Sequence, residues 1–470
     1  MLLLRACLLW LAAAAPPLLP LLPLLPQAPP PPPPPTPSPP LPPLQYNTSH
    51  AHIAAVWELV RAGSPLTAPA LAAVAAAAAA ALRSPGFSVM NKTRLPPSGD
   101  RHDYMSVGAY WWACSARGPQ ACSCNATHCA TASPACNVTT GLPWVSCDGH
   151  ADRPAMNSLD QPQLAGLASA VGALAQGYYW TREEALAQRA AELVRAWFLD
   201  PATSMNPNLN FGQAFPGVQS NGSFSGLIET DGSFIEVLDA VALLQAPAPC
   251  GARGAPCAGS PAWTPADAAA LRAWLAQWSA WLAASPFSAT ALSFYNNHNT
   301  WLRGAWFLVA AWLGDTPRAA ALLRGALGGA PHAPICDQIG AGGELPAEEA
   351  RVNSIGYVLM DVAGLLNLAG ASRFAPFVAG GGGSAVGDLY TFTCPSGNHS
   401  SVRGAVEYLL PFATGQRQWP YPTETADFSG AAPLLRQLAV AQRNSSLWAL
   451  AAGIKNASAA DKSLLWWRMD

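Results

Sequence analysis

Charged side chains are scarce in this chain of 470 residues, since they make up 11% of it, against roughly a quarter in an ordinary soluble protein. The formal net charge is −2, so no basic surface for nucleic acid is expected. An anionic ligand would have to be met by a few cations placed inside a cleft. The scarcity of charge therefore excludes binding by a broad charged surface.

A long uninterrupted apolar run is also missing from the N-terminus. Residues 1–15, MLLLRACLLWLAAAA, are apolar apart from Arg5, but prolines follow from Pro16, whereas a membrane-spanning helix needs about 20 apolar residues. We predict a signal peptide at about residues 1–15, with a single-pass anchor as the alternative, and no stable membrane insertion. Residues 16–44 are almost entirely proline and leucine, which is typical of a low-complexity spacer that packs no core.

The cysteines lack the spacing of a metal site. Six of them crowd into residues 114–147, where the CSC motif does not fit zinc ligation and no paired histidines follow. Ten cysteines remain after Cys7, and this even number predicts disulfides. We expect those in 114–147 to pair mainly among themselves, and Cys250 to pair with Cys257. No metal and no cofactor are predicted.

Acceptor sequences for N-glycosylation agree with export from the cytosol. We therefore predict a secreted, extracellular glycoprotein, located in the medium, in a cell wall or in a periplasm-like space. The eight acceptor asparagines are Asn47, Asn91, Asn125, Asn137, Asn221, Asn398, Asn444 and Asn456.

Alternating strand patterns are scarce as well, and helical periodicity replaces them from about residue 50. Residues 164–178 and 186–197 each carry apolar side chains at helical spacing, and only a short WTRE link separates them. Many such helices are apolar on more than one side, which favours a layered assembly. We predict an all-α fold over residues 45–470, an (α/α) toroid or barrel of sequential antiparallel helix pairs with a disulfide-rich surface insertion. An α-solenoid is the rival, although no repeat period supports it.

Four polar, aromatic segments interrupt the helices. They are LPPSGDRHDYMSVGAYWW (95–112), DPATSMNPNLNFGQAFPG (200–217), SFYNNHNTW (293–301) and ELPAEEARVNSIGY (344–357). Aromatic faces stack on the C–H surface of sugar rings, and side-chain amides pair with hydroxyls. These segments therefore indicate a saccharide-binding cleft.

In these motifs and their order, the sequence resembles the alginate lyase family of polysaccharide lyases over roughly residues 85–420. The resemblance implies that Asn297, His298, Arg351 and Tyr357 are catalytic. Asn353 stands where the family often has a second arginine, and the insertion at 114–147 departs from the family's short loop. The predicted substrate-binding residues are Arg101, His102, Tyr104, Trp111, Asn208, Asn210, Gln213 and Trp301.

The chemistry of β-elimination matches these residue types. The reaction removes the C5 proton of a uronate, so the adjacent carboxylate must be neutralised. Asn297 can donate to that carboxylate, and His298 can donate to it or accept the C5 proton. Tyr357 can protonate the leaving oxygen and, in a syn geometry, act as the base. Because the reference pKa of tyrosine is about 10, the cation of Arg351 is expected to help Tyr357 to ionise.

We therefore predict a monomeric, secreted polysaccharide lyase whose partner is an anionic polysaccharide, alginate or a related uronan. One alternative is a non-catalytic polysaccharide-binding protein of the cell wall, favoured by Asn353, the low cation count and the proline-rich start. The other is a glycoside hydrolase on the same toroid, which needs two carboxylates about 5–10 Å apart. Its candidate carboxylates are Asp103, Glu229, Asp231 and Glu348.

Overall fold

The structure is a computed structural model that describes residues 50–115, 136–137, 139–219, 221–249, 256–327, 335–374, 388–394 and 400–467. The chain divides into two units, Met1–Pro40 and Leu41–Asp470, and the second holds all of the described residues. The predicted signal peptide and the proline-rich spacer lie outside the described residues.

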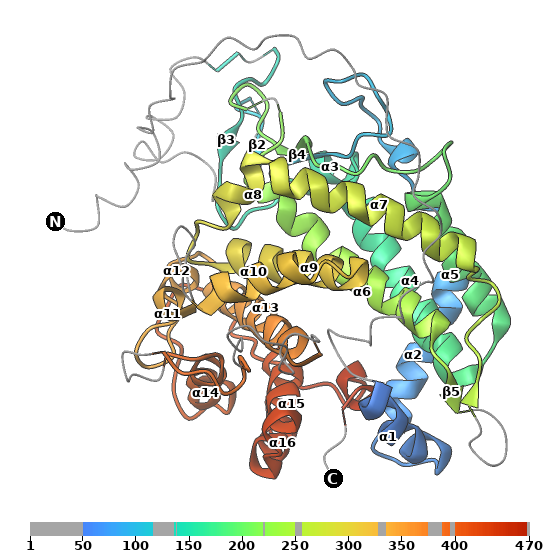
Figure 1. Cartoon of the computed structure of the whole chain (residues 1–470). Helices are drawn as coiled ribbons and strands as arrows, with labels where there is room; N and C mark the ends of the chain where they lie inside the picture. The colour runs from blue at the N-terminus through green and yellow to red at the C-terminus, as the bar shows by residue number, and fades with distance from the viewer. Residues whose placement is uncertain are drawn as a thin grey trace. The chain divides into compact units, whose positions relative to one another are not determined.

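Helices dominate the described part of the chain (Figure 1). This confirms the predicted helix-rich class with little sheet. The α-helices are α1 (His50–Arg61), α2 (Ala68–Leu82), α3 (Arg153–Asn157), α4 (Gln161–Thr181), α5 (Glu184–Phe198), α6 (Leu227–Gln245), α7 (Pro265–Ala284), α8 (Pro286–Ala291), α9 (Asn297–Leu313), α10 (Thr316–Leu327), α11 (Ile335–Gln338), α12 (Pro346–Glu349), α13 (Ser354–Phe374), α14 (Val402–Ala413), α15 (Ala431–Gln442) and α16 (Ser445–Ala452). The 3-10 helices among the described residues are η1 (Val89–Asn91), η3 (Phe224–Gly226) and η4 (Lys462–Leu465).

Local sequence signals account for several of these boundaries. Thr264 caps α7 in a capping box, because its side chain accepts from the backbone of Asp267 while the Asp267 carboxylate accepts from the backbone of Thr264. The helix α4 ends where Arg182 adopts a left-handed conformation, and α5 begins two residues later at Glu184. A link this short returns the chain antiparallel. The predicted helix pair is therefore present, and α4 packs against α5.

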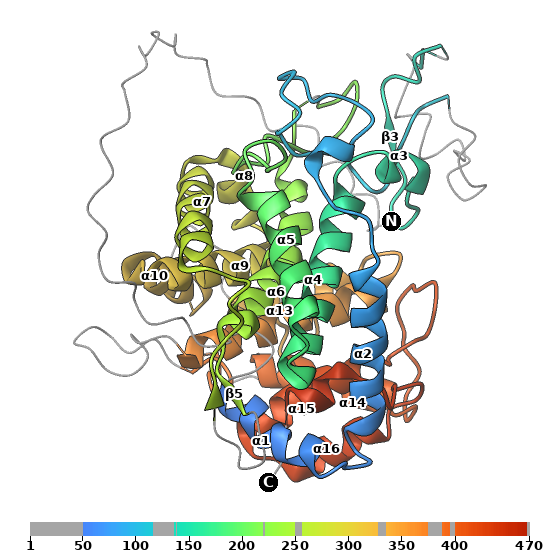
Figure 2. The same ribbon diagram turned by 90° about the vertical axis from the view of Figure 1, so that its right-hand side faces the viewer.

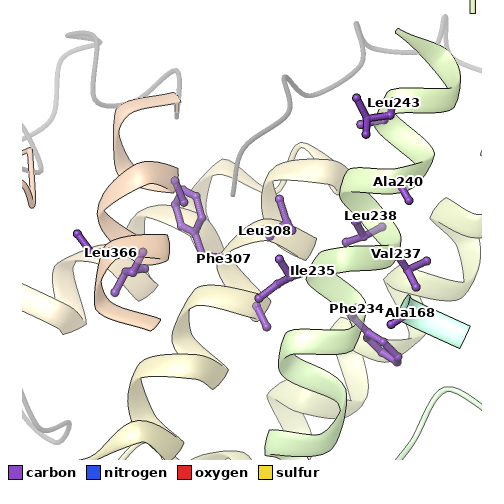
Figure 3. Close-up of a cluster of buried hydrophobic side chains, with 14 of the residues drawn as sticks. Ala168, Phe234, Ile235, Val237, Leu238, Ala240, Leu243, Phe307, Leu308 and Leu366 are labelled. Atoms are coloured by element: carbon purple, nitrogen blue, oxygen red, sulfur yellow. The ribbon is translucent and has the colours of Figure 1, made fainter. Parts of the chain in front are cut away.

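The core runs through the longest helices. The helix α4 packs against α2 and α6, α6 packs against α9, and α9 packs against α10 and α13. Figure 2 shows α4, α5 and α6 running side by side. Figure 3 shows how Ile235 and Leu238 of α6 approach Leu308 of α9, with Leu366 of α13 in the same cluster. All four side chains are buried. The helix α13 is long and apolar enough to cross a membrane, but most of it is buried inside the protein.

Strands are short and pair two by two. They are β1 (Met105–Val107), β2 (Trp111–Trp112), β3 (Val145–Ser146), β4 (Phe211–Ala214), β5 (Ala248–Pro249) and β6 (Pro256–Cys257). The parallel pair β1–β4 joins two of the predicted polar segments, 95–112 and 200–217. The antiparallel pair β2–β3 connects the first of these segments to the end of the cysteine-rich insertion. Figure 1 shows β2, β3 and β4 at the same end of the helices as α8.

All of the described cysteines are disulfide-bonded, as predicted. Cys114 pairs with Cys136 inside the cysteine-rich insertion, while Cys147 and Cys257 also belong to disulfides. A further bond, which the spacing did not predict, joins Cys336 of α11 to Cys394. The predicted partner of Cys257, Cys250, lies outside the described residues.

Candidate active site

The asparagine-rich segment 293–301 places His298 in the first turn of α9. Asn296 is the N-cap of this helix, since its Oδ1 accepts from the backbone N of His298 at 3.1 Å. Asn299 turns inward and donates from Nδ2 to the carbonyls of Leu292 and Phe294, at 2.7 and 3.0 Å. Two of the three neighbouring amides therefore hold the backbone around His298, where the sequence had suggested sugar binding.

The imidazole of His298 is half-buried beside two phenylalanines. Phe224 of η3 meets it edge-on at 5.3 Å, and Phe294 lies 6.3 Å away, between ring centroids. Desolvation, and then the positive charge of Arg351, lower the pKa of His298 to about 4. Nδ1 is buried and has no hydrogen-bond partner among the described residues. At neutral pH, His298 is therefore an uncharged imidazole with a free ring nitrogen.

Asn297 is attached to the core by a buried carboxylate. Its backbone N and its Nδ2 both donate to Oε1 of Glu348, each at 2.7 Å. Asn297 is 1% exposed and Glu348 is 0% exposed, so water does not compete for these bonds. The amide keeps one N–H and its carbonyl oxygen for another partner. The sequence had indicated Glu348 only as part of the motif before Arg351 and as a candidate carboxylate of a hydrolase. In the structure it orients Asn297.

A second buried carboxyl, Asp361 of α13, lies within electrostatic reach of Glu348. Burial, and then the charge of Glu348, raise the pKa of Asp361 to about 8, and burial raises the pKa of Glu348 too. One oxygen of each group, Oε2 of Glu348 and Oδ1 of Asp361, has no partner among the described residues. Gln338 donates to the other Asp361 oxygen at 2.6 Å. Asp361 therefore favours the protonated form at neutral pH, while the two bonds from Asn297 favour the ionised form of Glu348.

Arg351 and Tyr357 lie together, as their six-residue spacing suggested. The Arg351 guanidinium donates from Nη2 to the Tyr357 hydroxyl at 2.9 Å, and its Cζ lies 3.8 Å from the centroid of the tyrosine ring. Arg351 also forms a bidentate ion pair with Asp148, at 2.6 and 3.1 Å. The Tyr357 hydroxyl in turn donates to the hydroxyl of Tyr110 at 2.7 Å.

Tyr110 and Asp148 were missing from the predicted site, and the β2–β3 pair brings them there. The strands align Trp111 with Ser146, and the backbone N of Cys147 donates to the carbonyl of Tyr110 at 2.7 Å. Tyr110 carried a usable signal, because it lies within the polar segment 95–112. Asp148 carried none, since the residue after a cysteine cluster has no distinctive pattern.

The ionisation expected for Tyr357 is corrected by the structure. Its pKa is raised, chiefly by desolvation and also by the hydrogen bond to Tyr110, although the charge of Arg351 acts in the opposite direction. Arg351 favours ionisation, as expected, but desolvation outweighs it, so Tyr357 is not a phenolate near neutral pH in this conformation. Tyr357 is a neutral phenol, and that state can give a proton to a leaving oxygen.

Four of the predicted substrate-binding side chains form hydrogen bonds within the protein. Arg101 donates to the carbonyls of two residues near η1, and a ring nitrogen of His102 lies 2.6 Å from the carbonyl of Ser204. Tyr104 is fully buried and donates to Glu229. Trp301 donates to a backbone carbonyl of α13. These contacts shape the walls of the site, and the burial of Tyr104 excludes its direct contact with a sugar in this conformation.

Of the other four, Trp111, Asn208 and Gln213 are half-buried and Asn210 is exposed. Trp111 stacks on Phe215 at 4.3 Å between ring centroids. Asn208 donates to Asp103 at 3.2 Å, and Gln213 has a positive φ of 47° while its backbone N donates to Ser106. Asn210 is exposed, and its Oδ1 accepts from the indole of Trp281 at 3.0 Å.

Three of the four carboxylates considered for a glycoside hydrolase accept hydrogen bonds inside the protein. Asp103 is buried and accepts from Ser98 and the asparagines of segment 200–217. Glu229 accepts from Tyr104 and Ser106, and desolvation raises its pKa to about 7. Asp231 is buried and Glu348 holds Asn297. Among the described residues, no group of three His, Cys, Asp or Glu side chains is placed to hold a metal ion.

Comparison with known proteins also finds similarity to alginate lyases. The alginate lyase family model matches residues 88–419. The crystal structure of an alginate lyase from Bacteroides ovatus is similar, with a TM-score of 0.74 and 27% sequence identity, over 91% of this chain and 99% of that one. No curated protein matches the sequence.

Proposed function

Since this chain belongs to the alginate lyase family and is a polysaccharide lyase, we propose that it cleaves a uronate-containing polymer, alginate or a related uronan, by β-elimination. The observation that carries this proposal is one arrangement of three groups. The neutral, half-buried imidazole of His298 lies within electrostatic reach of Arg351, and Arg351 is bonded to the neutral phenol of Tyr357. These are the base, the cation and the acid that the reaction needs.

In the proposed reaction, His298 accepts the proton from C5 of the uronate. The C5–H electron pair forms the double bond to C4, the bond from C4 to the leaving oxygen breaks, and Tyr357 gives that oxygen its proton. Arg351 has a side chain that is 25% exposed, so a substrate carboxylate can reach it. Binding of that carboxylate would raise the pKa of the nearby imidazole, which strengthens the base when substrate is present. Asn297 is 1% exposed, so in this conformation it does not reach the carboxylate, which corrects the expected direct bond. It acts by fixing the first turn of α9, which carries His298.

We further propose that the helix pairs close into an (α/α) toroid over residues 45–470, and that the mature protein acts outside the cytosol as a monomer. Sequential packing of α4 with α5 and of α9 with α10 supports the toroid. The disulfides support an oxidising compartment.

The test is an assay of the purified protein on alginate, polymannuronate, polyguluronate and a glucuronan, followed by the ultraviolet absorbance of the unsaturated uronate. Elimination produces this absorbance, whereas hydrolysis does not. A gain on at least one polymer is expected. Release of reducing ends without the absorbance would establish a hydrolase, and binding of a uronan without either signal would establish a non-catalytic binding protein.

A further inference from the structure

A pocket of about 430 Å³ lies beside the candidate active site, between the end of α7, the start of α8 and the loop that carries Asn210. The helix α8 packs against η3, and Phe224 of η3 contacts the His298 ring. Contacts through α8 and η3 thus link the pocket to the surroundings of His298. The proposed reaction does not use the pocket, although one lining residue, Asn210, is among the predicted substrate-binding residues.

One wall of the pocket is the indole of Trp281, held in a fixed orientation. Its ring stacks on Trp278 at 5.2 Å, and Trp278 stacks on Trp274 at 5.8 Å, between ring centroids. Its Nε1 donates to Oδ1 of Asn210 at 3.0 Å. The ring is therefore a rigid aromatic surface whose polar atom is already satisfied, as in aromatic platforms that bind the C–H face of a sugar.

The remaining walls supply a second aromatic ring and side-chain amides. Phe287 of α8 and the amides of Asn210 and Asn221 line the pocket. Gly222 makes this placement possible, because its backbone N donates to the carbonyl of Asn210 at 2.6 Å, and a Cβ there would lie 2.7 Å from backbone atoms of Gly212. Amides beside an aromatic surface bind hydroxyl groups.

The pocket differs from the catalytic cluster in charge. Among the described residues that line it, none is charged, so it offers a uronate carboxylate no cation. Its chemistry suits the apolar face and the hydroxyls of a pyranose.

We propose that this pocket is an accessory subsite that binds one pyranose ring of the polysaccharide chain, away from the cleaved bond, by stacking on Trp281 and bonding to the amides of Asn210 and Asn221. The inference rests on the proposed function, since the ring belongs to the polymer that the catalytic cluster cleaves. A glycan on Asn221, which lies in an Asn-Gly-Ser acceptor sequence, has the same chemistry, and the experiment separates the two sources.

The experiment compares Trp281→Ala with the parent protein on alginate oligosaccharides of increasing length and on the polymer. A lost stacking contact raises KM for long chains by roughly three- to tenfold, while KM for the shortest cleaved oligosaccharide and kcat at saturation stay close to the parent values. Trp448→Ala, which removes a partly buried tryptophan from α16, is the matched control and leaves both constants unchanged. Equal KM values for Trp281→Ala and the parent at every length would overturn the subsite.

Production of the protein in a glycosylating host and in a host without N-glycosylation distinguishes the polymer from the attached glycan, since the residue at 221 is asparagine in both. If the polymer fills the pocket, Trp281→Ala has the same effect in both preparations. If the glycan fills it, Trp281→Ala raises KM only in the unglycosylated protein, and the polymer assignment is overturned.

Failure of the proposed function has a different signature. Should the parent cleave no uronan, calorimetric titration with an alginate oligosaccharide decides the subsite by itself. If Trp281→Ala binds the oligosaccharide more weakly than the parent, the subsite proposal stands. If the two affinities are equal, or neither protein binds, the subsite proposal is overturned.

Discussion

The two halves of the candidate active site are held in place by different parts of the molecule. Asn297 and His298 stand on α9 and are fixed from inside, by the buried carboxylate of Glu348 and by the Asn296 cap. Arg351 and Tyr357 are held from outside, by Asp148 and Tyr110 on either side of the cysteine-rich insertion. The first half depends on the core, whereas the second depends on a surface segment that disulfides stabilise.

This contrast has energetic consequences. A hydrogen bond to a buried charge leaves unsatisfied groups when one partner is removed, at a cost of about 1–3 kcal/mol. An exposed ion pair contributes roughly 0–1 kcal/mol. Changes on the core side should therefore affect stability and catalysis together, and changes on the surface side should affect catalysis with little loss of stability.

The largest effect is expected for Tyr357→Phe, which removes the proposed acid from the surface-held half. General acid–base groups contribute about 10² to 10⁴-fold in rate, so kcat on a uronan should fall by that amount. The phenyl ring keeps its volume and its contact with Arg351, so the melting temperature should change little. The prediction fails if the variant folds and cleaves at the parent rate.

A smaller loss of kcat, combined with a loss of stability, is expected for Glu348→Ala in the half that the core holds. Both donors of Asn297 lose their acceptor, so the free energy of unfolding should fall by about 1–3 kcal/mol and kcat by roughly 10- to 100-fold. Thermal unfolding and steady-state kinetics measure the two.

Two variants sharpen this test. Glu348→Gln keeps an oxygen that can accept from Asn297 and should restore most of kcat, while Glu192→Ala removes an exposed glutamate and should change neither quantity. Full activity of Glu348→Ala would show that Asn297 needs no such support.

The pH profile separates the two halves without any mutation. Because the pKa of free His298 is lowered to about 4 and only the neutral imidazole accepts a proton, kcat/KM should fall tenfold per pH unit below about pH 4. The raised pKa of Tyr357 keeps the phenol protonated well above neutral pH, so the alkaline limb should come later than for a free tyrosine. Initial rates in buffers whose effect on folding is checked by circular dichroism measure this, and an acidic limb near pH 6.5 would contradict the desolvated histidine.

The smallest effect is expected for Asp148→Ala, which frees the Arg351 guanidinium. Since the Asp148 side chain is 41% exposed, the melting temperature should hardly move, and kcat/KM should change by less than about fivefold. The matched control is Asp388→Ala, which removes the partner of Arg373 from a similar half-exposed pair on other elements. A loss of stability in Asp148→Ala larger than in the control would show that both halves depend on the core.

Much of the helical part of the fold could be predicted from the sequence. The 3.6-residue period of residues 164–178 and 186–197 and the Thr264–Asp267 capping box are local signals, and the structure has helices at each of them. The four polar segments were also correctly recognised as the places where helices are interrupted. The burial of Tyr104 was not predictable, because its motif position says nothing about which neighbours cover it.

The sequence alone determined the helical class, the cysteine-rich insertion and the family, because caps, periodicity and motif order are properties of neighbouring residues. Only the tertiary structure decided how the site is held. Glu348 reaches Asn297 across 51 residues, Asp148 reaches Arg351 across 203, and Tyr110 reaches Tyr357 across 247. It also decided the protonation of the site, since the pKa values of His298 and Tyr357 depend chiefly on desolvation, and desolvation exists only once distant segments have packed together.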